Sequence, residues 1–483
     1  METAFYRWIV NLRNTRPFWF WVLRIINILF VAFLLYLTGK YLYIKGPSKF
    51  LEGIGDLIIN LLASVVAVAG GYILVKVTSV LAHRREDQIK VNYRNSDQWK
   101  QYGTEYLHRF TMNGSRFIVY CDVLLRKADY DKLEIDDDPN RNFELDSFIK
   151  QQYFDLVEAH TKSKSIHSRT VRLCGFTAPT KEYPRTAVIH TMRSTYLAHL
   201  LTNRALDYHI KPEVTIRRIF ENTARLTPLA LSKMSNHIGI NALVFLPRNG
   251  EKRGYLLMPK RGSDATVAKN GVTASLATRL QMDNKECFAD GYQSKMTIDY
   301  IEKGCILDGL PAAIRVSRDC LNEKMEQQSD FLQIDLLGIA RDIYEGGKPT
   351  FFYAVYLDMT VEEYFRLSDE YVEKMTNTAN AAKQQKKKGI LPLSSDKIDE
   401  VKEVYVADWT SVKMSERKRG PQSDNDNVYV VADDDRLLCF DAIDREKTLK
   451  QRKKGNDEPV FSRYALNFEQ NLISNFLFLK ELE

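Results

Sequence analysis

Two long apolar runs near the N-terminus give the strongest hydropathy pattern of the chain. Residues 25–39 and 57–75 contain no charged side chain, and the first run extends back through residues 18–23 with only Arg24 interrupting it. The hydrocarbon core of a bilayer requires roughly 20 mostly apolar residues of helix. The pattern therefore predicts two transmembrane helices within residues 17–82, joined by a short link into a hairpin.

A signal peptide and a buried hairpin of a globular core are the alternative explanations. A signal peptide has an apolar region of roughly 7–15 residues and a small-residue cleavage site, whereas a second apolar run follows here. A core hairpin normally keeps a polar stripe, which these runs lack almost completely. Two spans, preceded by a cytosolic or interfacial segment at residues 1–16, remain the prediction.

Charged, polar and small residues bear on the orientation and packing of this hairpin. Arginines precede the first span and follow the second, and the positive-inside rule then favours cytosolic termini, although the link also carries lysines. Arg24 is expected either to extend to the cytosolic interface or to mark, with the other polar and small residues, a contact between copies of the hairpin. The span residues singled out are Arg24, Asn27, Ser64, Gly70 and Gly71.

The chain behind the spans has the pattern of an α+β cytosolic region. We expect a charged neck at residues 83–110 and an α+β accessory module at 111–235. Within them, the pattern predicts strands at 117–125 and 171–176, a loop at the acidic stretch 134–140, and a helix at 191–206.

Residues 236–394 have the pattern of a mixed sheet. Strands are predicted at 239–247 and 253–261, on either side of an Asn-Gly turn, and at 331–340 and 350–357, on either side of the turn 344–349. A helical pattern at 308–326 lies between the two strand pairs. Hairpin, helix and hairpin in this order predict a sheet with a helix packed against it.

Residues 395–483 either complete this sheet or form a lobe of their own. The pattern predicts strands at 428–431 and 437–440 and an amphipathic helix at 468–479. Three basic segments are predicted to be solvated, namely 383–389, 416–420 and 450–455.

Composition adds two constraints. The six cysteines of the 483-residue chain form no CxxC pair, which argues against a zinc site or a disulfide scaffold and for a reducing cytosol. The net charge of +7 is modest and is compatible with anionic lipid or with a phosphate ligand. We expect no recognition of DNA by the protein.

Residues 237–368 resemble the Nudix hydrolase domain in the order of their motifs. LLMPKRGS is similar to its early strand and substrate-edge turn, and AAIR to the entry of its helix. LLGIARDIYEGGKPTFFYAVYLDMT is similar to the strands that follow the helix. The resemblance covers about a quarter of the chain and implies a Nudix-like mixed sheet with flanking helices.

The catalytic box of Nudix enzymes, G-x5-E-x7-R-E-U-x-E-E-x-G-U, is degenerate in this sequence. Two registers of the box are open. With Gly304 as the box glycine, Leu310 replaces the first glutamate, Arg318 matches, and the metal-ligand positions hold Asp319, Asn322 and Glu323. With AAIR fixing the register at Arg315, the ligand positions hold Val316, Arg318 and Asp319.

Either register leaves too few carboxylates for a full metal cluster, because Mg²⁺ is best served by carboxylate oxygen. We therefore expect no catalytic residue and no required cofactor. Asp319 and Glu323 either hold residual Mg²⁺ or form an inert surface pair. Binding without turnover is the behaviour of a sensor.

Two spans followed by a degenerate Nudix-like domain resemble the transmembrane-Nudix effectors of bacterial CBASS antiphage defence. This resemblance implies a multi-pass protein of the bacterial inner membrane that depends indirectly on a phage-activated nucleotidyltransferase. A cyclic di- or trinucleotide then binds the soluble domain, and the clustered spans disrupt the lipid bilayer. A homo-oligomer is required, because a two-span protomer cannot enclose a pore alone.

Eight residues are candidates for contacts to such a ligand. Arginine makes forked contacts to phosphate, and an aromatic face stacks on a base; solvated charges and core aromatics are the alternatives. The candidates are Arg248, Lys260, Arg261, Arg341 and Lys348 for phosphates, and Tyr344, Phe351 and Tyr353 for bases. Arg341 and Lys348, which flank a Gly-Gly turn, are the leading pair.

Two other functions remain open. A membrane-tethered Nudix hydrolase cleaves a nucleoside diphosphate derivative with Mg²⁺ and loses activity when Asp319 or Glu323 is replaced. A plain membrane scaffold neither binds nor hydrolyses a nucleotide.

Overall fold

The computed structural model describes most residues between 101 and 480, and the predicted spans at 17–82 lie outside the described residues. No helix in the described part of the chain is long and apolar enough to cross a membrane. The gaps are 113–114, 159–167, 181–184, 211–213, 262–271, 281, 283–294, 312–313, 315–330, 372, 374–376, 378–400, 409–414, 419–435, 444–449, 451–452, 456–460 and 465–469.

The chain divides into two compact units. The first unit carries short helices, and a buried ion pair joins two of its segments. Arg217 donates from Nε and Nη2 to the two carboxylate oxygens of Asp207 at 2.7 and 2.9 Å. This forked geometry satisfies both buried charges. The helices are α3 (Ser147–Gln151), α4 (Tyr153–Glu158), α5 (Tyr196–Leu201) and α6 (Ile216–Phe220).

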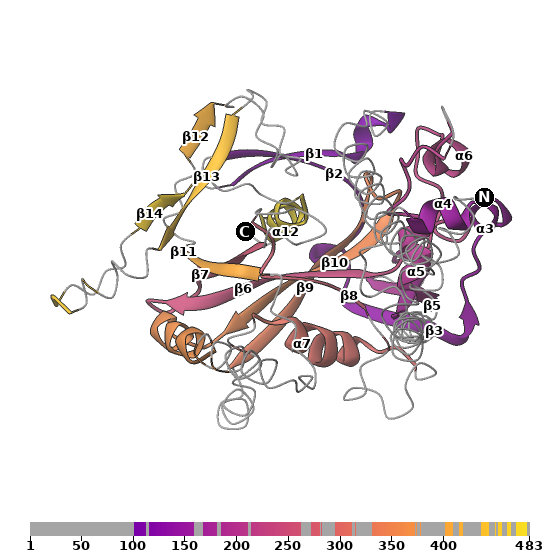
Figure 1. The fold of residues 1–483 in the computed structure, drawn as a ribbon. Helices are drawn as coiled ribbons and strands as arrows, with labels where there is room; N and C mark the ends of the chain where they lie inside the picture. Colours follow the sequence, from indigo (N-terminus) through magenta and orange to yellow (C-terminus); the bar gives the residue numbers. More distant parts are fainter. Residues whose placement is uncertain are drawn as a thin grey trace, which may run out of the picture. The chain divides into compact units, whose positions relative to one another are not determined.

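The second unit is built on a large, curled, mixed sheet (Figure 1). Its strand order is β1-β2-β9-β10-β6-β7-β11-β13-β12, with β8 beside β6 and β14 beside β13. Strands β6 and β10 run parallel. The strands are β1 (Leu107–Met112), β2 (Ser115–Arg126), β6 (Gly239–Arg248), β7 (Glu251–Arg261), β8 (Leu276–Arg279), β9 (Leu332–Asp342), β10 (Lys348–Leu357), β11 (Val401–Asp408), β12 (Ser415–Lys418), β13 (Arg436–Ile443) and β14 (Phe461–Tyr464).

Alternate residues of β6 face two separate hydrophobic cores. Ile240 and Val244 belong to the core that also holds Ile306, next to the short helix α7 (Leu307–Gly309). Leu243 and Phe245 belong to the core on the other face of the sheet. This side-chain alternation is the normal consequence of the pleat, and it explains why β6 carries apolar residues on both of its faces.

Helix α12 (Gln470–Lys480) fills the concave face of the curled sheet. Strands β1 and β2 pass over it, and β6, β9 and β10 pass beneath it (Figure 1). Residues 472–479 are all buried, including Ser474 and Asn475. The helix predicted at 468–479 is therefore confirmed, but it is not amphipathic, because strands surround it and leave residues 472–479 no solvent-facing stripe. Since β11 also pairs with β7, the C-terminal region completes the sheet.

A smaller sheet has the order β3-β5-β4, formed by β3 (Lys132–Asn142), β4 (Arg169–Thr177) and β5 (Thr186–Thr195). Strands β3 and β5 are parallel, and β4 and β5 are antiparallel. Asp137 of β3 accepts two hydrogen bonds from the buried guanidinium of Arg193 in β5, at 2.7 and 2.8 Å. This pair fixes the register of the two parallel strands.

The structure confirms the predicted strands of both hairpins as well as those at 117–125, 171–176 and 437–440. The Asn249-Gly250 turn is also confirmed, since both residues have positive φ, at 51° and 86°. The structure describes a helical segment at Tyr300–Ile306 that continues into α7 and ends before Pro311. Most of the helix predicted at 308–326 lies outside the described residues.

Two predictions in the N-terminal half are wrong. The acidic stretch 134–140 belongs to β3, because its exposed carboxylates alternate with inward residues and Asp137 is neutralised by Arg193. The predicted helix at 191–206 is instead the end of β5 followed by the short α5, since Thr191 and its neighbours pair with β4. Residues 83–100 of the predicted neck lie outside the described residues, and its last residues, from Leu107, belong to strand β1, which pairs with β2.

Candidate functional site

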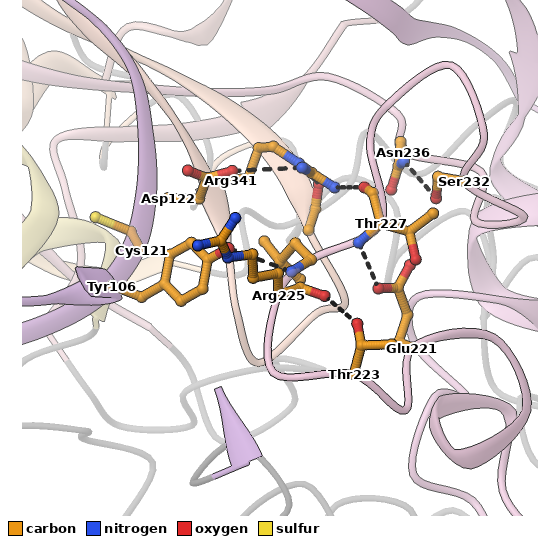
Figure 2. Close-up of polar contacts among 12 residues, drawn as sticks. Tyr106, Cys121, Asp122, Glu221, Thr223, Arg225, Thr227, Ser232, Asn236 and Arg341 are labelled. Atoms are coloured by element: carbon orange, nitrogen blue, oxygen red, sulfur yellow. Dashed lines mark hydrogen bonds and ion pairs between the residues drawn. The ribbon is translucent and has the colours of Figure 1, made fainter. Parts of the chain in front are cut away.

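The predicted ligand residue Arg341 is the centre of a buried polar network at the end of β9. Its Nη1 donates to Asp122 of β2 at 3.3 Å, its Nη2 to the Thr227 carbonyl at 2.7 Å, and its Nε to the Gly347 carbonyl at 3.2 Å. Figure 2 shows Arg341 between Asp122 and Thr227. Only 4% of Arg341 is exposed, so its guanidinium joins three segments of the protein and has no open face for a phosphate in this arrangement.

The loop at residues 220–227 completes the network. Thr227 donates its backbone N–H to the buried Glu221 carboxylate at 3.0 Å, and the hydroxyl of Tyr106 accepts from the Leu226 N–H at 3.3 Å (Figure 2). Burial raises the pKa of Asp122 above its usual range, although the charge of Arg341 and its hydrogen bond lower it. The network holds the loop against β2 and β9.

The turn between β9 and β10 contains a pair of carboxylates and a lysine. Asp342 accepts the backbone N–H of Tyr344 at 2.8 Å, and Glu345 makes an ion pair with Lys348 at 2.8 Å. Burial and the neighbouring Glu345 carboxylate raise the pKa of Asp342 to about 7, although Lys348 and the backbone donors lower it. Asp342 can therefore exchange a proton near neutral pH, which is a property common at functional sites.

The predicted aromatic ligand residues are packed inside the protein. Tyr344 is 3% exposed and makes an edge-on contact with Tyr120, at a ring-centroid distance of 6.2 Å. Phe351 and Tyr353 are completely buried in the core on the α7 side of the sheet. The Tyr353 hydroxyl has no hydrogen-bond partner among the described residues. In this arrangement these rings stabilise the β9–β10 hairpin and do not offer a free face to a base.

The remaining predicted residues are dispersed. Arg248 stacks over the ring of Tyr255 at 5.5 Å, and Lys348 keeps 17% of its side chain exposed while it pairs with Glu345. Lys260 and Arg261 end β7, and their backbones pair with β11; their side chains, like Asp319 and Glu323, are outside the described residues. Among the described residues, no group of three or more potential ligands could hold a metal ion.

The structure reveals a basic groove that sequence reasoning missed. It has a volume of about 520 Å³ and lies where β1 and the end of β2 meet the end of α12. Four of its lining residues are basic, and three are apolar. They are His108, Arg109, Arg126 and Lys480, with Leu107, Phe110 and Leu477. We call this site the β1–α12 groove.

Contacts at the groove hold the strands and the helix together. His108 makes a hydrogen bond through Nε2 to the Cys121 carbonyl at 3.0 Å, and Lys480 donates to the Thr111 carbonyl at 2.5 Å. Burial and the charge of Arg126 lower the pKa of His108, although its bond to Cys121 raises it. The groove residues come from opposite ends of the described chain, so no local sequence pattern indicates them.

Comparison with known proteins leaves the chain without an assigned family. No protein family matches its sequence, and no curated protein matches it.

Proposed function

We propose that this protein is a membrane-anchored receptor for a cyclic oligonucleotide, acting as an antiphage effector of the transmembrane-Nudix type. Binding of a cyclic di- or trinucleotide to the α+β region shifts a homo-oligomer towards a state in which its paired spans disrupt the bacterial inner membrane. A ligand drives such a change only if it binds one state more tightly than the other. A nucleotidyltransferase is expected to supply the ligand.

The observation that carries this proposal is the arrangement of β6, β7, β9 and β10 in the chain that follows the two apolar runs. The two hairpins occur in the order that the Nudix-like resemblance implies, and β6 lies parallel to β10 in a mixed sheet. The resemblance supports a nucleotide cradle, and the uncharged runs support the membrane-spanning part.

Dye leakage from liposomes tests the proposal directly. The full chain is reconstituted in liposomes that contain a self-quenching dye, and a panel of cyclic di- and trinucleotides is added. We expect at least one of them to release the dye and linear mononucleotides to release none. Tight binding of a cyclic nucleotide without leakage contradicts the effector mechanism, and the absence of any binding contradicts the receptor itself.

A membrane-tethered Nudix hydrolase is the second candidate. Asp319 and Glu323 supply two carboxylates on the sequence segment where the Nudix box is expected, and carboxylates are the ligands that Mg²⁺ prefers. This function predicts Mg²⁺-dependent release of a mononucleotide or phosphate that is lost in Asp319→Asn and Glu323→Gln. Catalytic turnover by the wild type that both variants abolish favours the hydrolase over the receptor.

A further inference from the structure

The β1–α12 groove has the charge and the size of a site for a small anion. Its volume of about 520 Å³ lies within the range of ligand pockets, roughly 300–1,000 Å³. Three of its lining residues are permanently cationic, and none is a carboxylate. Like charges that converge on a concave surface raise the local concentration of counter-ions, so the groove attracts a negatively charged ligand.

Arg109 is the side chain that most clearly remains available for that ligand. It is exposed on β1, and among the described residues it makes no hydrogen bond or ion pair with another side chain. Arg126 lies at the end of β2, and its backbone N–H donates to the Asp129 carboxylate at 3.2 Å. Lys480 reaches β1 from the end of α12. The three cationic residues therefore line one groove from three elements.

The apolar lining adds a second requirement. Phe110 stacks on Phe117 at a ring-centroid distance of 5.1 Å, which holds its ring in place. Leu477 contributes a further apolar surface from α12. A bare inorganic anion makes no use of these two side chains, whereas a ligand with both a phosphate and a flat or apolar group does.

We propose that the β1–α12 groove binds the phosphate of a nucleotide. Arg109, Arg126 and Lys480 contact the phosphate oxygens, and the base or sugar lies against Phe110 and Leu477. The choice of a nucleotide as the ligand rests on the proposed function. The expectation of a phosphate group does not, because it follows from the charges of the groove. It moves the expected site from the buried β9–β10 turn to the edge of the sheet.

A ligand in this groove contacts the first described strand and the last described helix at once. β1 begins at Leu107, 25 residues after the end of the predicted spans at Ala82. Bound phosphate neutralises repulsion between Arg109, Arg126 and Lys480 and thereby favours close contact between β1 and α12. The groove is thus formed in part by β1, the first described strand after the predicted spans.

A binding experiment on the full chain tests the groove. The protein is held in nanodiscs of neutral phosphatidylcholine, and binding of N-methylanthraniloyl-ADP is followed by fluorescence anisotropy, with inorganic pyrophosphate as competitor. Arg109→Glu reverses the charge of a side chain that makes no hydrogen bond or ion pair with another side chain among the described residues. We expect it to weaken binding at least ~10-fold, because charge-assisted hydrogen bonds contribute roughly 1.5–3 kcal/mol. Arg126→Gln is expected to act in the same direction.

A matched control separates the groove from general surface charge. Arg366→Glu changes the charge by the same amount at a half-exposed arginine that does not line the groove and is paired with Glu370 one helical turn later, and it should alter affinity less than 2-fold. Circular dichroism establishes that each variant is folded. Equal losses in Arg109→Glu and Arg366→Glu, or no binding of either probe to the wild type, overturn the proposal.

Two further experiments distinguish nucleotide binding in the groove from lipid binding, and the groove inference from the proposed function. Nanodiscs with phosphatidylglycerol distinguish a lipid headgroup phosphate from a free nucleotide. If the lipid headgroup occupies the groove, phosphatidylglycerol weakens probe binding to the wild type and does not change probe binding to Arg109→Glu, and this result overturns the nucleotide assignment. Groove binding without leakage in response to any cyclic nucleotide leaves the groove established and the proposed function contradicted. Leakage that persists in Arg109→Glu and Arg126→Gln supports the proposed function and contradicts the groove as its ligand site.

Discussion

At the scale of single residues, the charges of the β9–β10 turn and the network beside it are mostly occupied by one another. Arg341 is held by Asp122 and two backbone carbonyls, and Lys348 is held by Glu345. A buried ion pair contributes little net stability compared with an apolar replacement, but removing one partner leaves the other charge buried and uncompensated. These residues therefore affect folding strongly and are poor reporters of ligand binding.

Arg341→Ala is expected to lower the free energy of unfolding by about 3–5 kcal/mol. The substitution leaves the partly buried Asp122 carboxylate without its partner and releases the carbonyls of Thr227 and Gly347. Urea unfolding in detergent, followed by tryptophan fluorescence, measures the change. Arg366→Ala, which removes an arginine from a half-exposed pair, should cost less than about 1 kcal/mol. Similar costs for the two variants contradict the bridging role of Arg341.

Asp342→Asn is expected to change the pH dependence of stability. The pKa of Asp342 is about 7 in the folded protein against an ordinary value of 3.8, so between about pH 4 and 7 the unfolded chain releases a proton that the folded protein retains. The wild type therefore loses stability as pH rises through this window. Asparagine keeps the oxygen that accepts the Tyr344 N–H and removes the charge.

The difference in stability between the wild type and Asp342→Asn, followed as a function of pH, tests the role of Asp342. At pH 4 the stabilities should be similar, and above pH 7 the variant should be more stable by an amount on the order of 1 kcal/mol or more. Urea midpoints from pH 4 to 8 measure this, with Asp358→Asn at an exposed aspartate as the control. An equal offset between Asp342→Asn and the wild type at every pH contradicts the assignment.

At the scale of secondary-structure elements, the curled sheet depends on α12 for its concave core. Phe476 makes an edge-on contact with Phe117 of β2, and Phe478 stacks on Phe352 of β10 at a centroid distance of 5.1 Å. Phe478 also lies directly above Gly338 of β9. The helix therefore packs against strands that are remote in sequence and close in the sheet.

Gly338→Ala is expected to displace α12 and to lower the free energy of unfolding by about 2–3 kcal/mol. The added Cβ would lie 2.5 Å from the ring of Phe478 and 2.7 Å from the Leu125 carbonyl oxygen. Gly250→Ala is the control, since nothing lies within 4 Å of its Cβ and only the positive φ of 86° opposes the substitution. A smaller cost at Gly338 than at Gly250 contradicts the close packing of α12.

The elements that the sequence predicts correctly are those whose apolar residues are contiguous. The runs at 239–247, 253–261 and 350–357 became strands because residues 239–246, 256–259 and 350–357 are buried, and their side chains fill the cores on both faces of the sheet. The acidic strand β3 could not be predicted, since its stability depends on Arg193, which is 56 residues away from Asp137. Similarly, the groove joins Arg109 to Lys480, and only the folded sheet brings them together.

At the scale of the whole molecule, the proposed mechanism requires that the apolar runs enter lipid. Leu34→Lys combined with Val66→Lys places one charge near the middle of each predicted span, and each costs roughly 2.5–3.5 kcal/mol at a helix centre. We expect this double variant to be released from membranes by alkaline carbonate and to lose dye leakage. The control double variant, Leu34→Phe with Val66→Leu, preserves hydrophobicity and should behave as the wild type.

The lysine double variant also tests whether ligand binding and membrane disruption depend on separate parts of the chain. Because the groove is formed by β1, β2 and α12, the lysine variant should still bind N-methylanthraniloyl-ADP within about 2-fold of the wild type when folded in detergent. Loss of leakage with retained binding means that the receptor and the spans are separate parts joined by the segment before β1. Retained leakage in the lysine variant means that membrane disruption does not pass through these spans, and the hairpin mechanism then fails at its first step.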